Sequence, residues 1–548
     1  MCENHKHNHN NQRHGAALEH GEAHEQDHKN WNRRSFLKGL GVIGSGSIFL
    51  KGTPVSAIGS SPFGYLLNSS PSDRILVLIR LQGGNDGLNT VIPLYDYSEY
   101  ANNRPQIRIP ENQTLSISNE LGLNPTMENL MPLWEAGQMK VVNGVGYENQ
   151  NLSHFRSTDI WTSASDPEVI DESGWLGRFL ENEYPGFFTD PPETPPAIQI
   201  GGTGSLLFNG MDGDSSNYAL SVTDPQELYE IAQTGSLYDV ENLPPCYFGE
   251  QLGYVRTVAN QTFRYAEVIK EAFDAGNNNV DYGNNNLASQ LAMVARLIKG
   301  GLGSKFYVVS LNGFDTHAEQ MTQHDNLLEI LSTAVNDFYA DLAFGEWDKL
   351  VLSSTFSEFG RRLNQNASRG TDHGTAAPLF LFGPGLNGNG IVGDAPSLSD
   401  LDQNGNIKNS LDFRQVYRSI LEKWLCIDPE LIQNILGDDF QELDLGLNCE
   451  STVSSPTLPG YALKHEARYG ADGKVYIRYE IPNTMFVKVE IFSILGQPVQ
   501  TLFKGRQGAG QYQYEFSGGS YLATSRYVYR IEANGQAYSK VLVLQPSR

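Results

Sequence analysis

The chain has 548 residues and a formal net charge of −24. This length exceeds one ordinary domain and is ample to bury a large hydrophobic core. Contacts with nucleic-acid phosphates need clusters of Lys and Arg, and no such cluster appears, so the acidic chain excludes a nucleic-acid partner. An acidic balance suits an exported protein or one that collects divalent cations.

The first 57 residues are predicted to be an export signal. Arg33 and Arg34 precede an apolar, uncharged run over residues 39–50, and a small-residue cleavage pattern follows at Val55-Ser56-Ala57. The alternative is a chance arginine pair before a buried helix. The expected partner is the twin-arginine translocase, and the expected location is the periplasm, then the cell surface or the medium. No later stretch reaches the roughly 18 apolar residues of a transmembrane helix.

A polar extension with seven histidines, His5 to His28, lies ahead of the arginine pair. Histidine-rich tracts can bind metal ions. Because this tract precedes the export signal, it should be removed with it. We therefore interpret it as incidental or metal-handling and not as the active site.

A linker over residues 58–72 leads into an α/β domain expected over residues 73–450. The run Arg74–Leu81 is continuously apolar, as in parallel strands that are buried on both faces. A Gly-rich turn that carries Asp86 follows it. Further along, the pattern predicts a helix over 127–134, a strand over 140–145, and a helix opening at 151–156 with Ser153 as its N-cap.

The rest of this domain alternates strands and helices, although residues 180–280 are loop-rich and give no assignment. The pattern predicts helices over 287–298, 326–342 and 413–425, and strands over 306–311, 349–354 and 378–382. Apolar strands that alternate with helices indicate an α/β fold with a mostly parallel sheet.

Beyond residue 450 the pattern changes to short alternating strands separated by Gly, Pro and Asn. The strands are expected over 475–481, 487–492, 511–516 and 527–531. Residues 451–548 are therefore predicted to form a separate β-sandwich.

Histidines and carboxylates gather at the predicted strand ends. Only five histidines lie outside the extension, and three of them stand in short polar motifs: His154, His317 and His373. Asp86, Asp315 and Glu358 follow three different strands, and ligands bind beyond the carboxyl ends of strands in open α/β sheets. Converging imidazoles and carboxylates suit one or two divalent metal ions, which could clamp an anionic substrate.

Each of these residues also has a structural interpretation. Asp86 would favour a Gly-rich turn, and Glu358 could pair with Arg361 or Arg362. Ser153 is a routine N-cap. His324 is expected on a helix surface, and His465 belongs to the tail domain.

The cysteines and one acidic loop leave further alternatives open. Cys426 and Cys449 could pair in an oxidising compartment, but sequence alone does not fix the connectivity. Residues 400–407 match the opening of a calcium loop, yet its closing carboxylate, Asp412, is one position late. An Asx-rich surface loop is the favoured interpretation.

Five motifs in the body resemble the domain-of-unknown-function 1501 family, part of the alkaline phosphatase-like superfamily of phosphatases and sulfatases. They occur in this order: Leu81-Gln82-Gly83-Gly84-Asn85-Asp86-Gly87-Leu88-Asn89, Ser153-His154-Phe155, Gly313-Phe314-Asp315-Thr316-His317, Ser357-Glu358-Phe359-Gly360-Arg361 and Thr371-Asp372-His373-Gly374. The resemblance covers roughly residues 70–445 and implies an alkaline phosphatase-like sandwich.

The resemblance also implies roles for individual residues. Ser153 occupies the place of the nucleophile. The metal ligands would be Asp86, Asp315, His317, Glu358 and His373, and the ion would be zinc, magnesium, manganese or calcium. The residues that would contact the substrate or support a ligand are His154, Asp372 and Arg361. Three features depart from the superfamily: Phe359 replaces a second-site histidine, the spacing between Asp315 and His317 is shorter than usual, and there is no Cys-x-Pro-x-Arg sulfatase motif.

The tail resembles the immunoglobulin-like C-terminal sorting domains of type IX secretion substrates. The residues that carry this resemblance are Val487–Val499, Gly508-Ala509-Gly510, Tyr527–Ile531 and Lys540–Leu544. The type IX machinery would then be a second partner, although its passengers are expected to cross the inner membrane unfolded and twin-arginine substrates folded. The alternative is a carbohydrate-binding or spacer sandwich.

The sequence therefore predicts an exported metal-dependent hydrolase that cleaves small anionic phosphate or sulfate esters. The rival hypothesis is a non-catalytic surface or binding protein that keeps the fold and one structural metal.

Overall fold

The computed structural model describes most of the predicted α/β domain and the strands of the tail. The described residues are 74–222, except 185–186, 188–191, 193, 202–204 and 212; 265–449, except 389; the strand segments between 464 and 543; and two short strands, β1 (Ile48–Leu50) and β2 (Thr53–Val55). The twin-arginine motif, the histidine-rich extension and Cys246 lie outside these residues.

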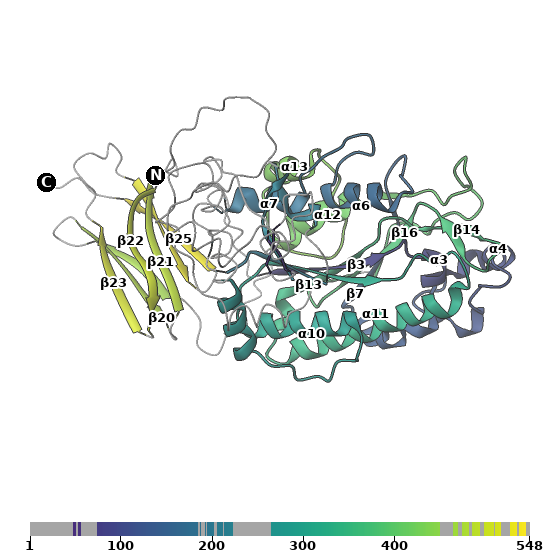
Figure 1. Ribbon diagram of the computed structural model, residues 1–548, viewed down its shortest axis with the longest axis horizontal. Helices are drawn as coiled ribbons and strands as arrows, with labels where there is room; N and C mark the ends of the chain where they lie inside the picture. Colours follow the sequence, from purple (N-terminus) through teal and green to yellow (C-terminus); the bar gives the residue numbers. More distant parts are fainter. Residues whose placement is uncertain are drawn as a thin grey trace, which may run out of the picture.

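A nine-stranded, mostly parallel sheet forms the centre of the body (Figure 1). Eight strands follow one another in the order β11 (Ala219–Val222), β8 (Ala197–Ile200), β12 (Phe306–Asn312), β3 (Ile75–Gln82), β13 (Val351–Phe356), β16 (Ala377–Phe382), β7 (Met139–Gly146) and β17 (Ile391–Val392). A ninth, β18 (Leu411–Asp412), also pairs with β7. The strand β16 runs antiparallel to both of its neighbours.

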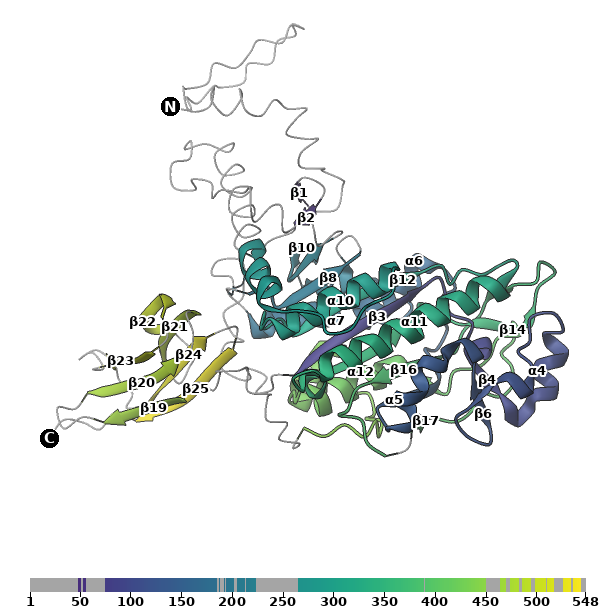
Figure 2. The ribbon, with the colours of Figure 1, turned by 90° about the horizontal axis from the view of Figure 1, so that it is seen from below.

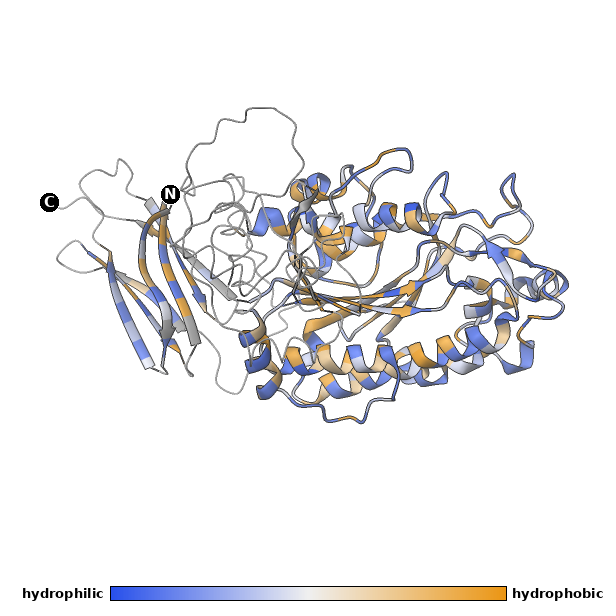
Figure 3. Ribbon diagram, viewed as in Figure 1, coloured by the Kyte–Doolittle hydropathy of each residue, from blue (hydrophilic) through white to orange (hydrophobic). Residues whose placement is uncertain are grey.

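Helices cover both faces of this sheet. Figure 1 shows α10 (Asn286–Lys299) and α11 (Gln320–Ala343) below it, and α6 (His154–Ser163), α7 (Trp175–Glu183), α12 (Phe413–Ser419) and α13 (Pro429–Leu436) above it. Alternate residues of β3 enter two different hydrophobic clusters, one with α10 and α11 and the other with α6, α7, α12 and α13. The hydropathy colours of Figure 3 show the same apolar sheet between helices with polar outer faces. This explains the continuous apolar run of β3.

The α/β class and the mostly parallel sheet are confirmed, with differences in detail. The expected helix over 127–134 is a 3₁₀ turn, η3 (Pro125–Leu130), followed by a short helix, α5 (Met131–Glu135). The expected helix over 413–425 ends as a π-helix, η6 (Ile420–Trp424). Residues 180–280 contain β8 and β11, whose four residues each are too short to show a periodicity.

The tail strands form two antiparallel sheets. One contains β19 (Lys464–Tyr469), β20 (Val475–Ile481) and β23 (Gly510–Phe516); the other contains β22 (Pro498–Gln507), β21 (Met485–Ser493), β24 (Arg526–Ala533) and β25 (Gln536–Val543). Residues of β20, β21, β23, β24 and β25 share one buried cluster. Figures 1 and 2 show these strands apart from the α/β body.

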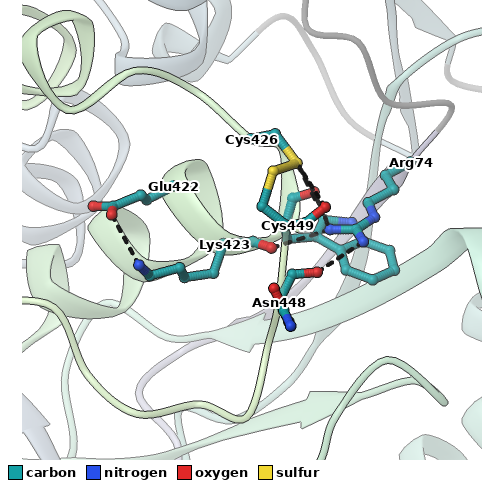
Figure 4. Close-up of a disulfide and its surroundings, with 7 residues drawn as sticks. Arg74, Glu422, Lys423, Cys426, Asn448 and Cys449 are labelled. Carbon is teal, nitrogen blue, oxygen red and sulfur yellow. Dashed lines mark hydrogen bonds and ion pairs between the residues drawn. A yellow bond between two sulfur atoms is a disulfide. The ribbon is translucent and has the colours of Figure 1, made fainter. Parts of the chain in front are cut away.

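A disulfide between Cys426 and Cys449 answers the question that the sequence left open (Figure 4). Beside it, the Arg74 guanidinium donates hydrogen bonds to the carbonyls of Trp424 (2.9 Å) and Asn448 (2.9 Å) and lies over the Trp424 ring. The bond closes a loop with a sequence separation of 23, for which chain entropy gives about 3 kcal/mol of stabilisation. The two ends of the body are thus joined at the edge of the sheet where β3 begins.

No helix in the described parts of the chain is long and apolar enough to cross a membrane.

Candidate metal centre

Three segments far apart in the sequence meet at one edge of the sheet. Asp315 and His317 follow the carboxyl end of β12, and His154 opens α6 after β7. His373 ends β15 (Thr371–His373), the second strand of a hairpin with β14 (Arg361–Gln365). Because β16 is antiparallel, its amino end lies at the carboxyl edge of the other strands, which brings His373 to the same place.

Three ligand-type atoms form a nearly equilateral triangle. Asp315 Oδ1 lies 3.0 Å from His317 Nε2 and 3.2 Å from His373 Nε2, and the two nitrogens are 3.0 Å apart. His154 Nε2 approaches the other carboxylate oxygen, Asp315 Oδ2, at 3.5 Å. Three imidazoles therefore surround one carboxylate.

The outer nitrogen of each imidazole faces an oxygen. His373 Nδ1 lies 2.9 Å from the Leu152 carbonyl, His154 Nδ1 lies 2.9 Å from Glu358 Oε1, and His317 Nδ1 lies 3.4 Å from Asp372 Oδ1. Carbonyl and carboxylate oxygens only accept hydrogen bonds, so Nδ1 carries the proton in each neutral ring. The bare Nε2 lone pairs then point at one another and at Asp315.

This arrangement fits a metal ion. Lone pairs about 3 Å apart repel unless a cation or a proton lies between them, and ligands at 2.0–2.1 Å from a tetrahedral ion are roughly 3.3 Å apart. Imidazoles whose Nδ1 is held by an acceptor are typical of metal sites. Nitrogen ligands with one carboxylate favour zinc-like ions over magnesium or calcium, which prefer oxygen. His154, Asp315 and His373 together offer three such atoms within 4.8 Å of one another.

Ionisation at the centre also suits cation binding. Partial burial opposes the charge on Asp315, but the hydrogen bond and the charge of Arg361 lower its pKa to about 2. Burial lowers the pKa of His373, so its ring is neutral at neutral pH. The hydrogen bond from Asn366 is the main cause that lowers the pKa of Asp372, the carboxylate behind His317.

Arg361 holds the centre together from behind. Its guanidinium is fully buried and donates to Asp315 Oδ1 (2.8 Å) and to the carbonyls of Gly84 (2.8 Å) and Thr371 (2.8 Å). It also bonds to the carbonyls of Gly83 and Phe314. The turn after β3, the turn after β12 and the β14–β15 hairpin are thereby fixed to one side chain. Arg361 supports a ligand and is not presented to a substrate.

Glu358 lies behind His154 and not among the three atoms of the triangle, although the sequence predicted it as a metal ligand. Its Oε1 accepts hydrogen bonds from the Gly83 backbone (2.8 Å) and from His154, and its carboxylate is almost fully buried. Glu358 therefore orients His154 and does not reach the triangle. The adjacent Phe359 packs its ring against His154 and His373 at centroid distances of 4.9 Å and 4.4 Å.

Asp86 is also outside the triangle. Its Oδ2 pairs with Arg104 Nη1 at 2.7 Å, both side chains are fully buried, and Gln320 donates to the same oxygen. Burial opposes the charge, but Arg104 and its hydrogen bond lower the pKa of Asp86. Arg104 is a partner that the sequence analysis missed.

Ser153 is exposed at the N-cap of α6, and its hydroxyl makes no capping hydrogen bond to that helix. Its backbone N–H is bound by the Asn151 side chain. The preceding carbonyl, on Leu152, accepts from His373, so Ser153 directly adjoins the centre. Ser153 is therefore the N-cap residue by position, as predicted, but its hydroxyl does not cap the helix.

Residues 400–407 form an Asx-rich loop, as favoured from the sequence. Asp402 Oδ1 accepts hydrogen bonds from the backbone N–H groups of Asn404 (2.8 Å) and Asn406 (2.7 Å). Asp400 pairs with Lys408. The carboxylates of this loop are thus engaged within the loop itself.

The prediction that His324 lies on the helix surface is wrong. His324 is buried beneath the turn after β3, and its Nε2 lies 3.0 Å from Asn85 Oδ1. The helical spacing contains the missed signal, because His324 falls on the same face of α11 as Leu328, Leu331 and Val335.

A stability measurement tests the burial of His324. Burial lowers its pKa from 6.5 to about 4. The unfolded chain therefore binds a proton as pH falls below about 6.5, while the folded chain binds none until about 4, so stability falls across this window. We expect wild type to lose about 2.5 kcal/mol more than His324→Gln between about pH 7 and pH 4.5. Urea unfolding with a chelator present measures this difference, and equal losses would contradict it.

The fold and site define an α/β protein with a three-histidine, one-carboxylate centre at the ligand-binding edge of its sheet. The model of the family described as "Protein of unknown function (DUF1501)" matches residues 250–448. No curated protein matches the chain.

Solved structures with low similarity include an alkaline phosphatase superfamily protein, a lipoteichoic acid synthase and a sulfatase. A protein in the alkaline phosphatase superfamily from Vibrio parahaemolyticus is 9% identical, with 78% of this chain and 81% of that chain covered and a TM-score of 0.29. The lipoteichoic acid synthase LtaP from Listeria monocytogenes is 10% identical, with 81% and 90% covered and a TM-score of 0.29. The PsFucS1 sulfatase from Pseudoalteromonas sp. is 12% identical, with 81% and 84% covered and a TM-score of 0.30. Similarities at this level assign no activity to this chain.

Proposed function

We propose that this protein is an exported, metal-dependent hydrolase of phosphate or sulfate esters. The observation that carries the proposal is the convergence of three Nε2 atoms on the Asp315 carboxylate, each ring being oriented by an acceptor at Nδ1. Asp315, His373, His317 and His154 would hold one ion. A bound divalent ion would supply Lewis-acid polarisation of an ester oxygen.

Ser153 is the proposed nucleophile. Its oxygen would bond to phosphorus or sulfur as the bond to the leaving alcohol breaks, and its proton would leave with that alcohol. Water would then displace the serine and release phosphate or sulfate. Backbone N–H groups at the start of α6, a helix of ten residues, favour the negative charge of the transferred group.

The export proposal covers both ends of the chain. Residues 1–57 would direct the chain to the twin-arginine translocase, and an immunoglobulin-like sandwich over 451–548 would direct it to the type IX machinery. The disulfide between Cys426 and Cys449 supports an oxidising destination, because such bonds persist mainly outside the cytoplasm.

The second candidate is a non-catalytic binding protein with one structural ion. The environment of the remaining carboxylates favours it, because Asp86 is paired with Arg104 and Glu358 with His154. Neither is positioned as a ligand of a second ion, and Phe359 fills the space beside two of the histidines. A two-metal clamp of the phosphoryl or sulfuryl group is therefore not part of the proposal.

Metal analysis tests the centre, and ester hydrolysis separates the two candidates. We expect about one zinc-like ion per chain in wild type beyond the content of Asp315→Ala and His373→Ala, because each variant removes a ligand. Every variant keeps the histidine-rich extension, so the difference reports the centre. Asp400→Ala, in the exposed pair with Lys408, serves as control and should lose none.

Equal metal content in wild type and Asp315→Ala would contradict the proposed metal-dependent hydrolase. With metal bound, a set of phosphate and sulfate monoesters and diesters should include a substrate whose hydrolysis falls roughly 10³-fold or more in Ser153→Ala without loss of metal. Metal binding without any turnover would leave the binding protein as the function.

A further inference from the structure

Bulky apolar side chains are exposed on α6, which begins at the metal centre, and on the loop that follows it. Few large hydrophobic residues in the described parts of the chain are strongly exposed, and three of them belong to α6 and the loop that follows it: Phe155 (86%), Val169 (50%) and Ile170 (82%). Phe155 directly follows Ser153 and His154. We refer to these three residues as the apolar rim.

The loop of the apolar rim is anchored to α6. Arg156 donates hydrogen bonds to the carbonyls of Pro167 (3.0 Å) and Val169 (2.5 Å), and Arg414 pairs with Asp166 at 2.6 Å. One arginine side chain therefore spans from the first turn of α6 to Val169. Exposed apolar groups that are held in place next to a polar site are typical of ligand contacts.

The charges around the opening disfavour substrates with many negative charges. Asp315 and Asp372 are about half exposed there, and Glu358 lies behind His154. The guanidinium that contacts the triangle, on Arg361, is buried among backbone carbonyls. A polyanion would meet these carboxylates, and in the part of the chain that the structure describes the arginine that pairs with Asp315, Arg361, does not face solvent.

We propose that the apolar rim receives the alcohol portion of the substrate, so that the preferred substrates are singly esterified phosphates or sulfates of an apolar, aryl-type alcohol. The inference rests on the proposed ester hydrolysis and names its substrate class. The anionic group lies at the metal centre and the start of α6, and the leaving alcohol lies on Phe155 and Ile170. Sulfated or phosphorylated polymers are poor ligands of this site.

Binding of two phosphonates to the full, zinc-loaded chain tests the proposal without turnover. Calorimetry should show phenylphosphonate binding about tenfold more tightly than methylphosphonate, because only the phenyl ring buries apolar area on the rim. Phe155→Ala and Ile170→Ser should each remove most of this preference. Inorganic polyphosphate, at equal phosphate concentration, should bind more weakly than phenylphosphonate.

Phe344→Ala is the matched control. Phe344 is 56% exposed and follows the 24-residue helix α11, whose other end lies at the site, so it is about 36 Å away along the helix axis. The Phe344→Ala variant should leave the preference for phenylphosphonate over methylphosphonate unchanged. The inference alone is overturned if Phe155→Ala keeps the phenyl preference, if both phosphonates bind wild type equally, or if polyphosphate binds best. If neither phosphonate binds the zinc-loaded wild type, the proposed ester hydrolysis fails and the inference falls with it.

Discussion

Replacing Arg361 by methionine is expected to cost about 3–5 kcal/mol of folding free energy and to weaken zinc binding by about 10–100-fold. The guanidinium is fully buried, and its loss would leave the Asp315 carboxylate and the carbonyls of Gly84 and Thr371 without their donor. The Arg361 hydrogen bond is also a main cause of the low pKa of Asp315, so that pKa should rise. Urea unfolding and zinc titration measure the two effects.

Two further variants make this prediction specific. Arg361→Lys keeps the charge but lacks the planar fork that reaches three loops at once, so it should recover only a small part of the loss. Arg369→Lys, in an exposed pair with Glu319, should change stability by less than about 1 kcal/mol. A stable Arg361→Met variant with unchanged zinc affinity would contradict the supporting role.

Gly83 is needed for the close packing of the turns that Arg361 joins. Gly83 has φ +125°, and a Cβ there would lie 2.3 Å from the backbone nitrogen of Asp315. The close approach of these two turns lets Arg361 reach both. The Gly-rich motif after the first strand therefore serves turn packing at the centre, which its sequence pattern alone did not reveal.

The sequence predicted the sheet well wherever a strand was long and apolar. The run of β3 enters two clusters on opposite faces, and that double burial produces the uninterrupted apolar pattern. The reversed direction of β16 was not predictable, because direction depends on the β14–β15 hairpin that precedes it. Short strands such as β8 carry too few residues for a periodic signal.

The sequence also located the centre but not the roles within it. Residue types at strand ends indicated a metal site, since they share one edge of the sheet. Which residue is a ligand and which orients a ligand depends on contacts such as that between His154 and Glu358, 204 positions apart. The sequence analysis named Glu358 as a ligand and His154 as a substrate-contacting or supporting residue; in the structure His154 Nε2 faces Asp315, and Glu358 lies at the other nitrogen of the same ring.

The buried pair of Asp86 and Arg104 gives the second large effect. Arg104→Met should destabilise the protein by about 3–5 kcal/mol, because it leaves a buried carboxylate without its counter-charge. Asp86→Asn should cost less, since Arg104 keeps its hydrogen bonds to Asn89 Oδ1 (2.8 Å) and the Leu363 carbonyl (2.8 Å). Urea unfolding at neutral pH ranks the two variants, and the reverse order would contradict this interpretation.

The contribution of Asp86 to stability should depend on pH with opposite signs in wild type and in Arg104→Met. In wild type the pKa of Asp86 is lowered, so its stabilisation is present above the unfolded value of about 3.9 and is lost as pH falls through the folded pKa. In Arg104→Met, burial acts without Arg104 and raises that pKa. The variant's deficit relative to wild type should then shrink as pH falls from about 7 to about 5, because Asp86 takes up a proton in the folded state.

Metal content tests whether Asp86 is a ligand of the metal centre or only the partner of Arg104. If Asp86 were a ligand, Asp86→Asn would lower zinc content as Asp315→Ala does. The pairing with Arg104 and Gln320 instead predicts that Asp86→Asn keeps its zinc while losing stability. Loss of zinc in Asp86→Asn at a pH where the variant remains folded would return Asp86 to the metal centre and would require Arg104 to move away from it.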